Sequence, residues 1–333
     1  MSNGNTTIQT SRLIESTILD FFMTFNLLVV GELISIFGMA ANVINIRVFY
    51  KLGFQESVDI TLTALSVSDL GALITIQLAN VMVNPWCLAA DVPFVPIDFL
   101  TLVSFYPHSY FIRVSGFIAS FASFERCLSV MVPLKVKTII NWRTSLVVNT
   151  SVFMITVFNV FSPYYFSYLG WTFIPERNKT LLVLSLRGDW ASGLGASYIV
   201  TDLFFPYFAL FLLIACNVVT ATKLANRLVW RASHLGLENS RSGSFSLKEK
   251  KVTRMLLVVS LICICCLAPQ STILTAVTFV SDIGLNADKF EVAFLCYCFS
   301  YLIESICSSI NIFVYYNMSS KYRRTFQALF CNR

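Results

Sequence analysis

Residues 251–280 read KVTRMLLVVSLICICCLAPQSTILTAVTFV, and this stretch sets the class of the chain. No charged side chain stands between Arg254 and Asp282. The run therefore exceeds the roughly 20 apolar residues that a helix needs to cross a lipid bilayer. Its apolar residues do not alternate with polar ones, which favours a helix over a strand of a membrane barrel. The stretch predicts a membrane-spanning helix.

The rest of the chain has the same apolar character. Of its 333 residues, 56% are hydrophobic and 13% are charged, and its mean hydropathy is +0.71. A soluble chain has about 25% charged residues, so these proportions exclude an ordinary cytosolic enzyme, a disordered protein and a secreted disulfide scaffold. We expect an all-α membrane protein that forms a seven-transmembrane helix bundle. The seven apolar runs are 26–49, 58–82, 98–131, 144–166, 196–225, 251–280 and 290–316.

Lysine and arginine indicate how these runs are oriented. With the N-terminus outside, 18 of the 24 Lys and Arg residues fall on the inner face, 5 on the outer face, and Arg113 within a span. Cytoplasmic loops carry such an excess of basic residues. We predict a multi-pass protein of the plasma membrane with an extracellular N-terminus (1–25), the helix bundle (26–316), and an amphipathic helix with a short cytoplasmic tail (317–333). The net charge of +6 is therefore a topology signal, and no nucleic-acid partner is expected.

Three positions are candidates for covalent modification. Asn5 and Asn178 begin the glycosylation sequons Asn-Thr-Thr and Asn-Lys-Thr on the predicted outer side. Cys331 follows the amphipathic stretch near the inner surface, so it is either palmitoylated or an unmodified thiol. The chain has only two histidines and no His cluster, so we expect no metal site built from His and Cys.

Ionisable side chains inside the predicted spans are costly in lipid, so each is a functional candidate. The alternative for each is an interhelical hydrogen bond that only stabilises the bundle. The ionisable residues are Glu32, Asp69, His108, Arg113, Glu125, Arg126, Asp202 and Glu304, and polar residues of the same spans are Asn42, Ser115, Ser308 and Asn311.

Five segments carry a family resemblance. In chain order they are Gly38-Met-Ala-Ala-Asn42, Leu65-Ser-Val-Ser-Asp69-Leu70, Glu125-Arg126-Cys127, Cys266-Leu267-Ala268-Pro269 and Asn311-Ile312-Phe313-Val314-Tyr315. Together they resemble the motifs of the rhodopsin-like (class A) G-protein-coupled receptors, in the family's order and on the matching runs.

The chain also departs from this family's pattern. Cys127, Leu267 and Ile312 replace the usual tyrosine, tryptophan and proline. Thr101 stands where the family has a cysteine, and the second outer loop (167–195) has none, so the hallmark disulfide lacks both partners. The departures indicate a divergent invertebrate branch, similar to molluscan chemosensory-type receptors or invertebrate peptide receptors.

The resemblance implies a receptor that converts extracellular ligand binding into activation of a heterotrimeric G protein. Arg126 is a cation at the inner mouth beside Glu125, and Glu249 opens the sixth run on the same face. An ion pair that forms and breaks there is a two-state element, and the alternative is a static pair beside anionic lipid. The predicted activation switch comprises Glu125, Arg126, Glu249, Pro269, Asn311 and Tyr315.

By the same resemblance, Asn42, Asp69, Ser115 and Asn311 line a polar hub. The hub either binds an allosteric sodium ion, which prefers oxygen ligands, or is purely structural. No other cofactor is expected. Arrestin and a receptor kinase are further partners that the resemblance leaves open. The third inner loop, about 228–248, is either a target of phosphorylation or an unmodified linker.

The resemblance places the ligand in the outer half of the bundle. His108 and Glu304 are expected to face each other there, with Gln270 and Ser271 at the floor. A buried carboxylate is expensive unless a cation meets it, and that cation is either protonated His108 or a ligand group. We predict a peptide or small chemosensory ligand with a positive group that contacts Glu304.

Three further residues bear on the ligand. Ser305 stands where opsins carry their retinal-binding lysine, which disfavours a light sensor, and His108 replaces the aspartate of amine receptors. Arg113 and Asp202 form either a structural ion pair or the site of a zwitterionic ligand. The complete predicted ligand site is His108, Arg113, Asp202, Gln270, Ser271, Glu304 and Ser305.

Two other functional classes compete with a receptor. A seven-helix transporter or channel predicts broken helices, internal symmetry or a ring of like charges, and the sequence shows none of these patterns. An intramembrane enzyme predicts paired catalytic carboxylates or a His-rich metal cluster within the spans, and the sequence shows neither. We therefore do not expect an enzyme.

Overall fold

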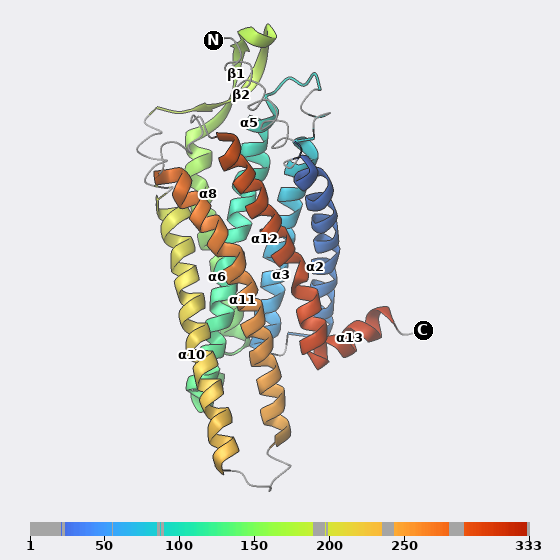
Figure 1. Cartoon of the computed structure of the whole chain (residues 1–333), viewed down its shortest axis with the longest axis vertical. Helices are drawn as coiled ribbons and strands as arrows, with labels where there is room; N and C mark the ends of the chain where they lie inside the picture. The colour runs from blue at the N-terminus through green and yellow to red at the C-terminus, as the bar shows by residue number, and fades with distance from the viewer. Residues whose placement is uncertain are drawn as a thin grey trace, which may run out of the picture.

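The computed structural model of this chain describes residues 21, 24–54, 56–84, 87, 90–188, 197, 199–234, 243–279 and 290–331. Long helices run side by side through most of the molecule (Figure 1). Six helices are long and apolar enough to cross a bilayer: Leu28–Leu52, Ser57–Met82, Trp142–Phe166, Ile199–Asn226, Thr253–Ile273 and Leu295–Met318. The chain is a multi-pass, mainly helical membrane protein, as its composition predicts.

The helical elements follow the predicted runs. Short π-helical turns, η1 (Asn26–Gly31), η2 (Thr101–Phe105) and η4 (Ile199–Phe204), lead into α2, α6 and α10. The helices are α2 (Glu32–Leu52), α3 (Ser57–Met82), α5 (Pro96–Leu100), α6 (Tyr106–Met131), α7 (Pro133–Ile139), α8 (Trp142–Phe166), α10 (Phe205–His234), α11 (Gly243–Phe279), α12 (Phe290–Met318) and α13 (Ser320–Phe330).

Helix α6 is as long as its neighbours but more polar. It has 26 residues and packs against α3, α8, α10 and α11. Its side chains include His108, Arg113, Glu125 and Arg126, which explains why its composition falls short of an apolar span. Contact with protein on several sides replaces contact with lipid, so a helix in this position tolerates charged groups. A seventh crossing by α6 remains a prediction.

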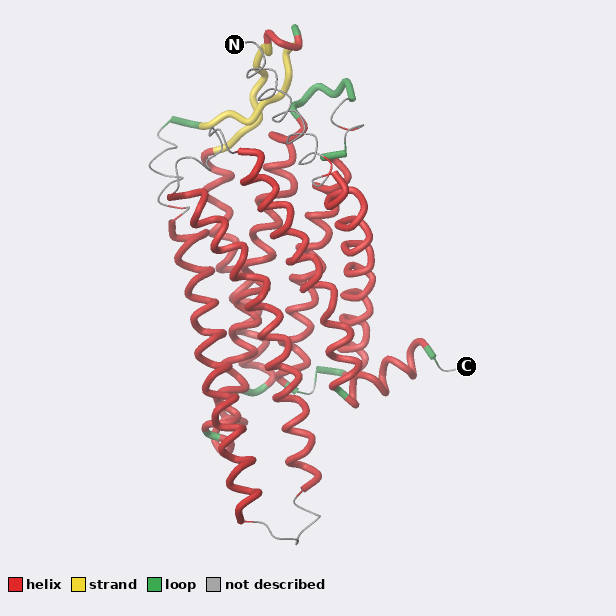
Figure 2. Tube along the Cα trace, in the orientation of Figure 1, coloured by secondary structure: helices red, strands yellow, loops and turns green. Residues whose placement is uncertain are grey.

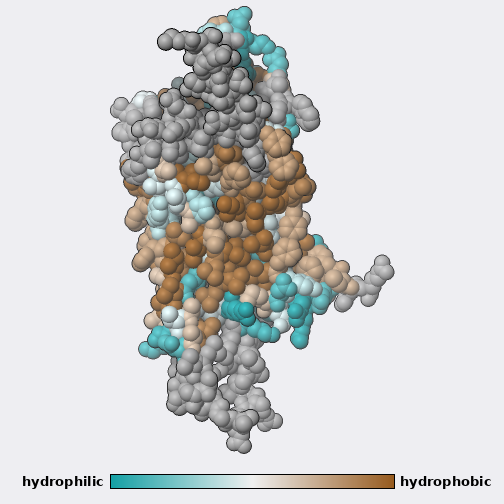
Figure 3. Space-filling view, viewed as in Figure 1, coloured by the Kyte–Doolittle hydropathy of each residue, from teal (hydrophilic) through white to brown (hydrophobic). Residues whose placement is uncertain are grey.

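The surface of the bundle is apolar around its middle. Figure 3 shows hydrophobic residues over the centre of one face and hydrophilic residues below them, towards the end where α13 leaves the bundle. On α8, Met154, Phe158 and Phe161 are 65–76% exposed. Exposed apolar surface of this extent is unfavourable in water, whereas lipid would cover it without a penalty.

The described chain is mainly helical, as expected, but the segment that follows α8 contains two strands. β1 (Ser167–Ile174) pairs antiparallel with β2 (Lys179–Leu186) around the short turn η3 (Pro175–Arg177). The hairpin projects from the end of the bundle opposite α13 (Figures 1 and 2). Both strands are rich in aromatic, β-branched and leucine side chains, which suit a pleated surface. Residues 167–186 of the expected second outer loop are therefore an ordered hairpin.

Hydrogen bonds hold this hairpin to the segment before α6. The Val95 amide donates to the Leu182 carbonyl at 2.9 Å, and the Leu182 amide donates to the Pro93 carbonyl at 2.9 Å. The Asp98 carboxylate accepts from the Leu184 amide at 3.0 Å. All ten cysteines are free thiols. Backbone pairing and the Asp98 side chain thus anchor the hairpin without a disulfide.

The inner end of the bundle holds α13 by polar and aromatic contacts. The Tyr322 hydroxyl donates to Asn45 Oδ1 at 2.6 Å, and Lys321 Nζ lies 2.8 Å from Asp59 Oδ2. The Tyr322 ring also packs near those of Phe49 and Tyr315. Helix α13 therefore leaves the bundle at a fixed angle (Figure 2). Its position along the inner membrane surface remains a prediction.

We expect Gly71→Ala to lower the free energy of unfolding by about 1–3 kcal/mol through overpacking. Gly71 lies where α3 meets α6, and a Cβ there would fall 2.4 Å from the Phe111 ring. Thermal unfolding in detergent measures the loss. Gly116→Ala is the matched control, because its Cβ would meet Leu267 at 3.4 Å and alanine favours a helix by about 1 kcal/mol. Equal losses from both variants would contradict the close α3–α6 approach.

Candidate functional site

His108 of α6 and Glu304 of α12 form a buried pair in the bundle. His108 Nε2 lies 3.1 Å from Glu304 Oε2. Both residues are only 2% exposed. The other ring nitrogen, Nδ1, lies 3.0 Å from the carbonyl oxygen of Ala72 on α3. The pair therefore links three helices, and its two side chains face each other as the sequence predicts.

Nδ1 of His108 has two possible hydrogen-bond partners, the Ala72 carbonyl at 3.0 Å and the Thr75 hydroxyl at 3.3 Å. In the tautomer in which Nδ1 donates to the carbonyl, which only accepts, Nδ1 carries a hydrogen. The contact between Nε2 and Glu304 Oε2 then needs one further proton. Either an imidazolium donates to a carboxylate, or a carboxylic acid donates to a neutral imidazole. The pair has no net charge in either state, which lowers the cost of burying it.

A second buried carboxylate, Asp69 of α3, organises a polar hub with three partners. Its Oδ1 accepts from Ser115 Oγ at 2.8 Å and from Ser308 Oγ at 3.4 Å. Its Oδ2 accepts from Asn311 Nδ2 at 2.9 Å. We call Asp69, Ser115, Ser308 and Asn311 the hub. It joins α3, α6 and α12, and Asp69 is 2% exposed.

Asn42 of α2 is attached to the hub indirectly. Its Nδ2 donates to the Ser308 carbonyl at 2.8 Å and to the Gly38 carbonyl at 3.0 Å. No direct hydrogen bond between Asn42 and Asp69 is seen among the described residues. Asn42 therefore ties α2 to the backbone of α12, one step away from the carboxylate.

A small cavity, the hub cavity, connects the hub with the His108–Glu304 pair. Its volume is about 30 Å³, and Asp69, Glu304 and Asn311 all border it. Two oxygens at this cavity, Glu304 Oε1 and Asn311 Oδ1, have no hydrogen-bond partner among the described residues. A cavity of this size has room for a water molecule, which would satisfy such oxygens.

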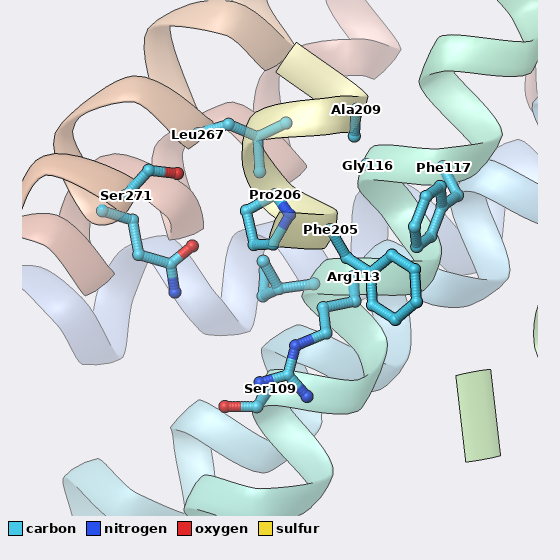
Figure 4. A pocket seen from close by; sticks show the side chains of 11 residues that line it. Ser109, Arg113, Gly116, Phe117, Phe205, Pro206, Ala209, Leu267 and Ser271 are labelled. Atoms are coloured by element: carbon cyan, nitrogen blue, oxygen red, sulfur yellow. The ribbon is translucent and has the colours of Figure 1, made fainter. Parts of the chain in front are cut away.

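A second cavity, the Arg113 cavity, lies between α6, α10 and α11 (Figure 4). Its volume is also about 30 Å³. Ile112, Gly116 and Leu267 border both cavities, so these three residues lie between them. The residues that line the Arg113 cavity are Ser109, Ile112, Arg113, Gly116, Phe117, Phe205, Pro206, Ala209, Leu267, Gln270 and Ser271.

The predicted ligand residues therefore divide between the two cavities. His108 and Glu304 lie together, and Glu304 faces the hub cavity. Gln270 and Ser271, expected at their floor, line the Arg113 cavity instead. Ser305 borders neither cavity in the described part of the chain, and its hydroxyl donates to the Tyr301 carbonyl at 2.9 Å. The Asp202 side chain lies outside the described residues.

At the inner end, Glu125 is held by hydroxyl groups. Its Oε1 accepts from Ser145 Oγ at 2.6 Å, and its Oε2 accepts from Thr61 Oγ1 at 3.4 Å. Asn149 Nδ2 donates to Thr61 Oγ1 at 3.2 Å and completes the cluster. Ser145, Thr61 and Asn149 are functional candidates that the sequence analysis missed. Their only signal is the i, i+4 spacing of Ser145 and Asn149, which places both on one face of α8.

The other residues of the predicted switch lie on α6, α11 and α12. Arg126 is half-buried at the inner end of α6. The side chain of Glu249 lies outside the described residues, so the contact of Glu249 with Arg126 stays a prediction. Pro269 lies within α11. Tyr315 is fully buried, with its ring 5.4 Å from that of Phe49.

The modification sites lie at the two ends of the molecule. Asn5 lies outside the described residues. Asn178 is exposed and follows the hairpin turn η3 with a left-handed backbone. Cys331 is exposed at the end of α13.

These features define a multi-pass helical membrane protein with small cavities and buried polar clusters between its helices. The sequence matches no protein-family model, and no curated protein matches it.

Proposed function

We propose that this chain is a rhodopsin-like G-protein-coupled receptor in the plasma membrane, with its N-terminus outside. The observation that carries the proposal is the hub. Asp69 accepts from Ser115 and Asn311, which the resemblance brings together although they lie far apart in the sequence. In the proposed receptor, α6 is the third of seven crossings and α13 lies along the inner surface as an eighth helix.

In the proposed receptor, Leu267 transmits ligand binding from one cavity to the other. It borders both the Arg113 cavity and the hub cavity, so a ligand in the first cavity that displaces Leu267 changes the second. Leu267 and Pro269 lie on α11. Because proline removes a backbone hydrogen bond, the helix can bend there. Outward movement of the inner end of α11 then exposes Arg126 to the G protein.

The hub also fits a sodium ion. Asp69, Ser115, Ser308 and Asn311 offer oxygen atoms at one cavity, and a hard cation prefers oxygen ligands. Asn311 Oδ1 has no hydrogen-bond partner among the described residues, so it can accept a cation. These four residues would hold the ion, whose charge would favour ionised Asp69. Arrestin and a receptor kinase would act at segment 228–248. The expected loop is shorter in the structure, because α10 continues to His234 and α11 begins at Gly243; residues 235–242 and all side chains of the segment lie outside the described part.

We expect Glu249→Ala to raise ligand-independent G-protein activation severalfold, because the substitution removes the partner proposed to restrain Arg126. Adding Arg126→Ala should abolish the rise. Nucleotide exchange on each G-protein family in membranes with matched receptor density measures both effects. Lys250→Ala, one residue along the same helix, is the control and should behave as the unsubstituted protein does.

Two outcomes would count against these ideas. Exchange by the Glu249→Ala protein that does not exceed that of receptor-free membranes, for every G-protein family, contradicts the receptor. A clear basal exchange that Glu249→Ala leaves equal or lower contradicts only the Arg126–Glu249 restraint.

A further inference from the structure

Three sulfur-containing side chains gather where α6 and α10 pack side by side towards the inner end of the bundle (Figure 1). Cys127 and Met131 lie four residues apart on α6, which places both on one face of that helix. The Cys127 Sγ atom lies 3.6 Å from the Met131 Sδ atom. The Cys127 thiol also interacts with the thiol of Cys216 on α10. We call Cys127, Met131 and Cys216 the sulfur cluster.

The sulfur cluster is buried on one side and open on the other. Cys127 and Cys216 are 7% and 8% exposed, whereas Met131 is 52% exposed. The methionine side chain is flexible, so an ion can reach the two thiols by displacing it. One turn beyond Cys216, on the same face of α10, the buried Thr220 Oγ1 has no hydrogen-bond partner among the described residues. This hydroxyl is a hydrogen-bond donor on the face of α10 that carries the Cys216 thiol.

The donor set of the cluster selects a soft metal ion. Thiolate and thioether sulfur atoms favour copper(I). Structural zinc takes four ligands from Cys, His and acidic side chains, and no group of three such side chains that could hold a metal occurs in the described part of the chain. With a metal–sulfur bond of about 2.3 Å, as for zinc, two sulfur atoms on one ion lie at most about 4.6 Å apart. The 3.6 Å between Cys127 and Met131 therefore fits one shared ion.

We propose that the sulfur cluster binds one copper(I) ion between α6 and α10. Cys127 and Cys216 bind it as thiolates, and Met131 binds it as a thioether. The ion displaces the two thiol protons and no electron is transferred, so the complex carries one negative charge, which the open side at Met131 leaves partly solvated. The sequence analysis expected no metal site built from His and Cys, and here a methionine completes the ligand set.

Competition for copper(I) between the purified full-length protein and the chelator bathocuproine disulfonate tests this proposal. The experiment is done without oxygen and with ascorbate, which keeps copper in its monovalent state. We expect the unsubstituted protein to retain one more copper(I) ion than the Cys127→Ser and Cys216→Ser proteins do. Cys298→Ser is the matched control, because it removes another buried thiol, on α12, and should keep that ion. Equal copper content in the unsubstituted, Cys127→Ser and Cys216→Ser proteins would overturn the proposal.

Met131→Leu separates the role of the thioether from an effect on folding. Met131 is exposed and leucine has a similar size, so this variant should fold as the unsubstituted protein does. X-ray absorption at the copper edge should show three sulfur neighbours of the retained ion in the unsubstituted protein and two in Met131→Leu, whose affinity for copper(I) should be severalfold weaker. Nitrogen or oxygen neighbours in place of sulfur, or identical spectra and affinities for the two proteins, would contradict this ligand set.

Two further results distinguish the copper site from its alternatives. If thiol trapping in intact cells finds a Cys127–Cys216 disulfide and the reduced protein retains no copper, the two cysteines are a redox pair and the proposal is wrong. The copper site does not depend on the proposed function. Copper binding without nucleotide exchange in the presence of any G-protein family would reject the receptor and leave the copper site standing, and exchange by Glu249→Ala without copper binding would do the reverse.

Discussion

His108→Leu is expected to lower the free energy of unfolding by about 3 kcal/mol. Removing one partner of a buried ion pair costs about 3–5 kcal/mol, and the lower end applies because Glu304 can take up a proton instead of remaining charged. His108 supplies the hydrogen bond to Glu304 Oε2 at 3.1 Å, and both side chains are nearly inaccessible. Leucine would leave the carboxyl group without a described partner, whereas the Ala72 carbonyl would still accept from the Thr75 hydroxyl at 2.8 Å.

Two variants separate this cause from simple loss of packing. Glu304→Gln should cost much less, because its amide N–H can donate to the Nε2 of neutral His108 while Nδ1 keeps its bond to Ala72. The double variant His108→Leu with Glu304→Leu should recover most of the loss, because no buried polar partner remains. Thermal or denaturant unfolding in detergent measures all three. If His108→Leu is as stable as the unsubstituted protein, the pair does not stabilise the bundle.

Two sets of contacts that the family resemblance implied are present in the structure. Asp69, Ser115 and Asn311 were expected together, and they are joined by bonds of 2.8 and 2.9 Å. His108 and Glu304 were likewise expected to face each other. Each of these polar groups lies within an apolar run, where few partners exist. The cost of an unpaired polar group in lipid therefore limits the arrangement to a few choices.

The division of the ligand residues between two cavities could not be predicted. Gln270 and Ser271 directly follow Pro269, and successive helical residues point about 100° apart. A small rotation of α11 therefore decides which cavity each side chain lines. The position of Leu267, between the Arg113 cavity and the hub cavity, depends on the same rotation. Sequence spacing gives the depth of these residues in the bundle, but it does not give the cavity that each side chain lines.

The partners of Glu125 and the hairpin were missed for different reasons. The partners missed at Glu125 are common polar residues, Thr61, Ser145 and Asn149. Their residue types do not show whether the side chain bonds a carboxylate on another helix or a carbonyl of its own helix. The hairpin was missed because segment 179–186, KTLLVLSL, shows no alternation of apolar and polar residues. A two-stranded hairpin is also marginal alone, and its contacts with Val95 and Asp98 come from a distant part of the chain.

The second large effect is expected at the hub, where Asp69→Leu should cost about 2–4 kcal/mol of unfolding free energy. Asp69 is the acceptor for Ser115, Ser308 and Asn311, and each buried donor left without an acceptor costs about 1–3 kcal/mol. The two serine hydroxyls can rotate towards carbonyls of their own helices, which reduces the total. For the Asn311 amide, Asp69 is the only acceptor found among the described residues.

Asp69→Asn should be far milder, because Asn311 Oδ1 is without a hydrogen-bond partner among the described residues. Rotation of the Asn311 amide by half a turn would present this oxygen to the N–H of the introduced amide, and the oxygen of the introduced amide would still accept from a serine.

The Asp69→Asn variant keeps the shape and removes the charge, so it separates the structural role of the hub from sodium binding. We expect the unsubstituted protein to unfold at a higher temperature in sodium chloride than in N-methylglucamine chloride of equal ionic strength, and Asp69→Asn to abolish the difference. If the unsubstituted protein does not respond to sodium while Asp69→Leu is still destabilised, the hub stabilises the fold by its hydrogen bonds alone.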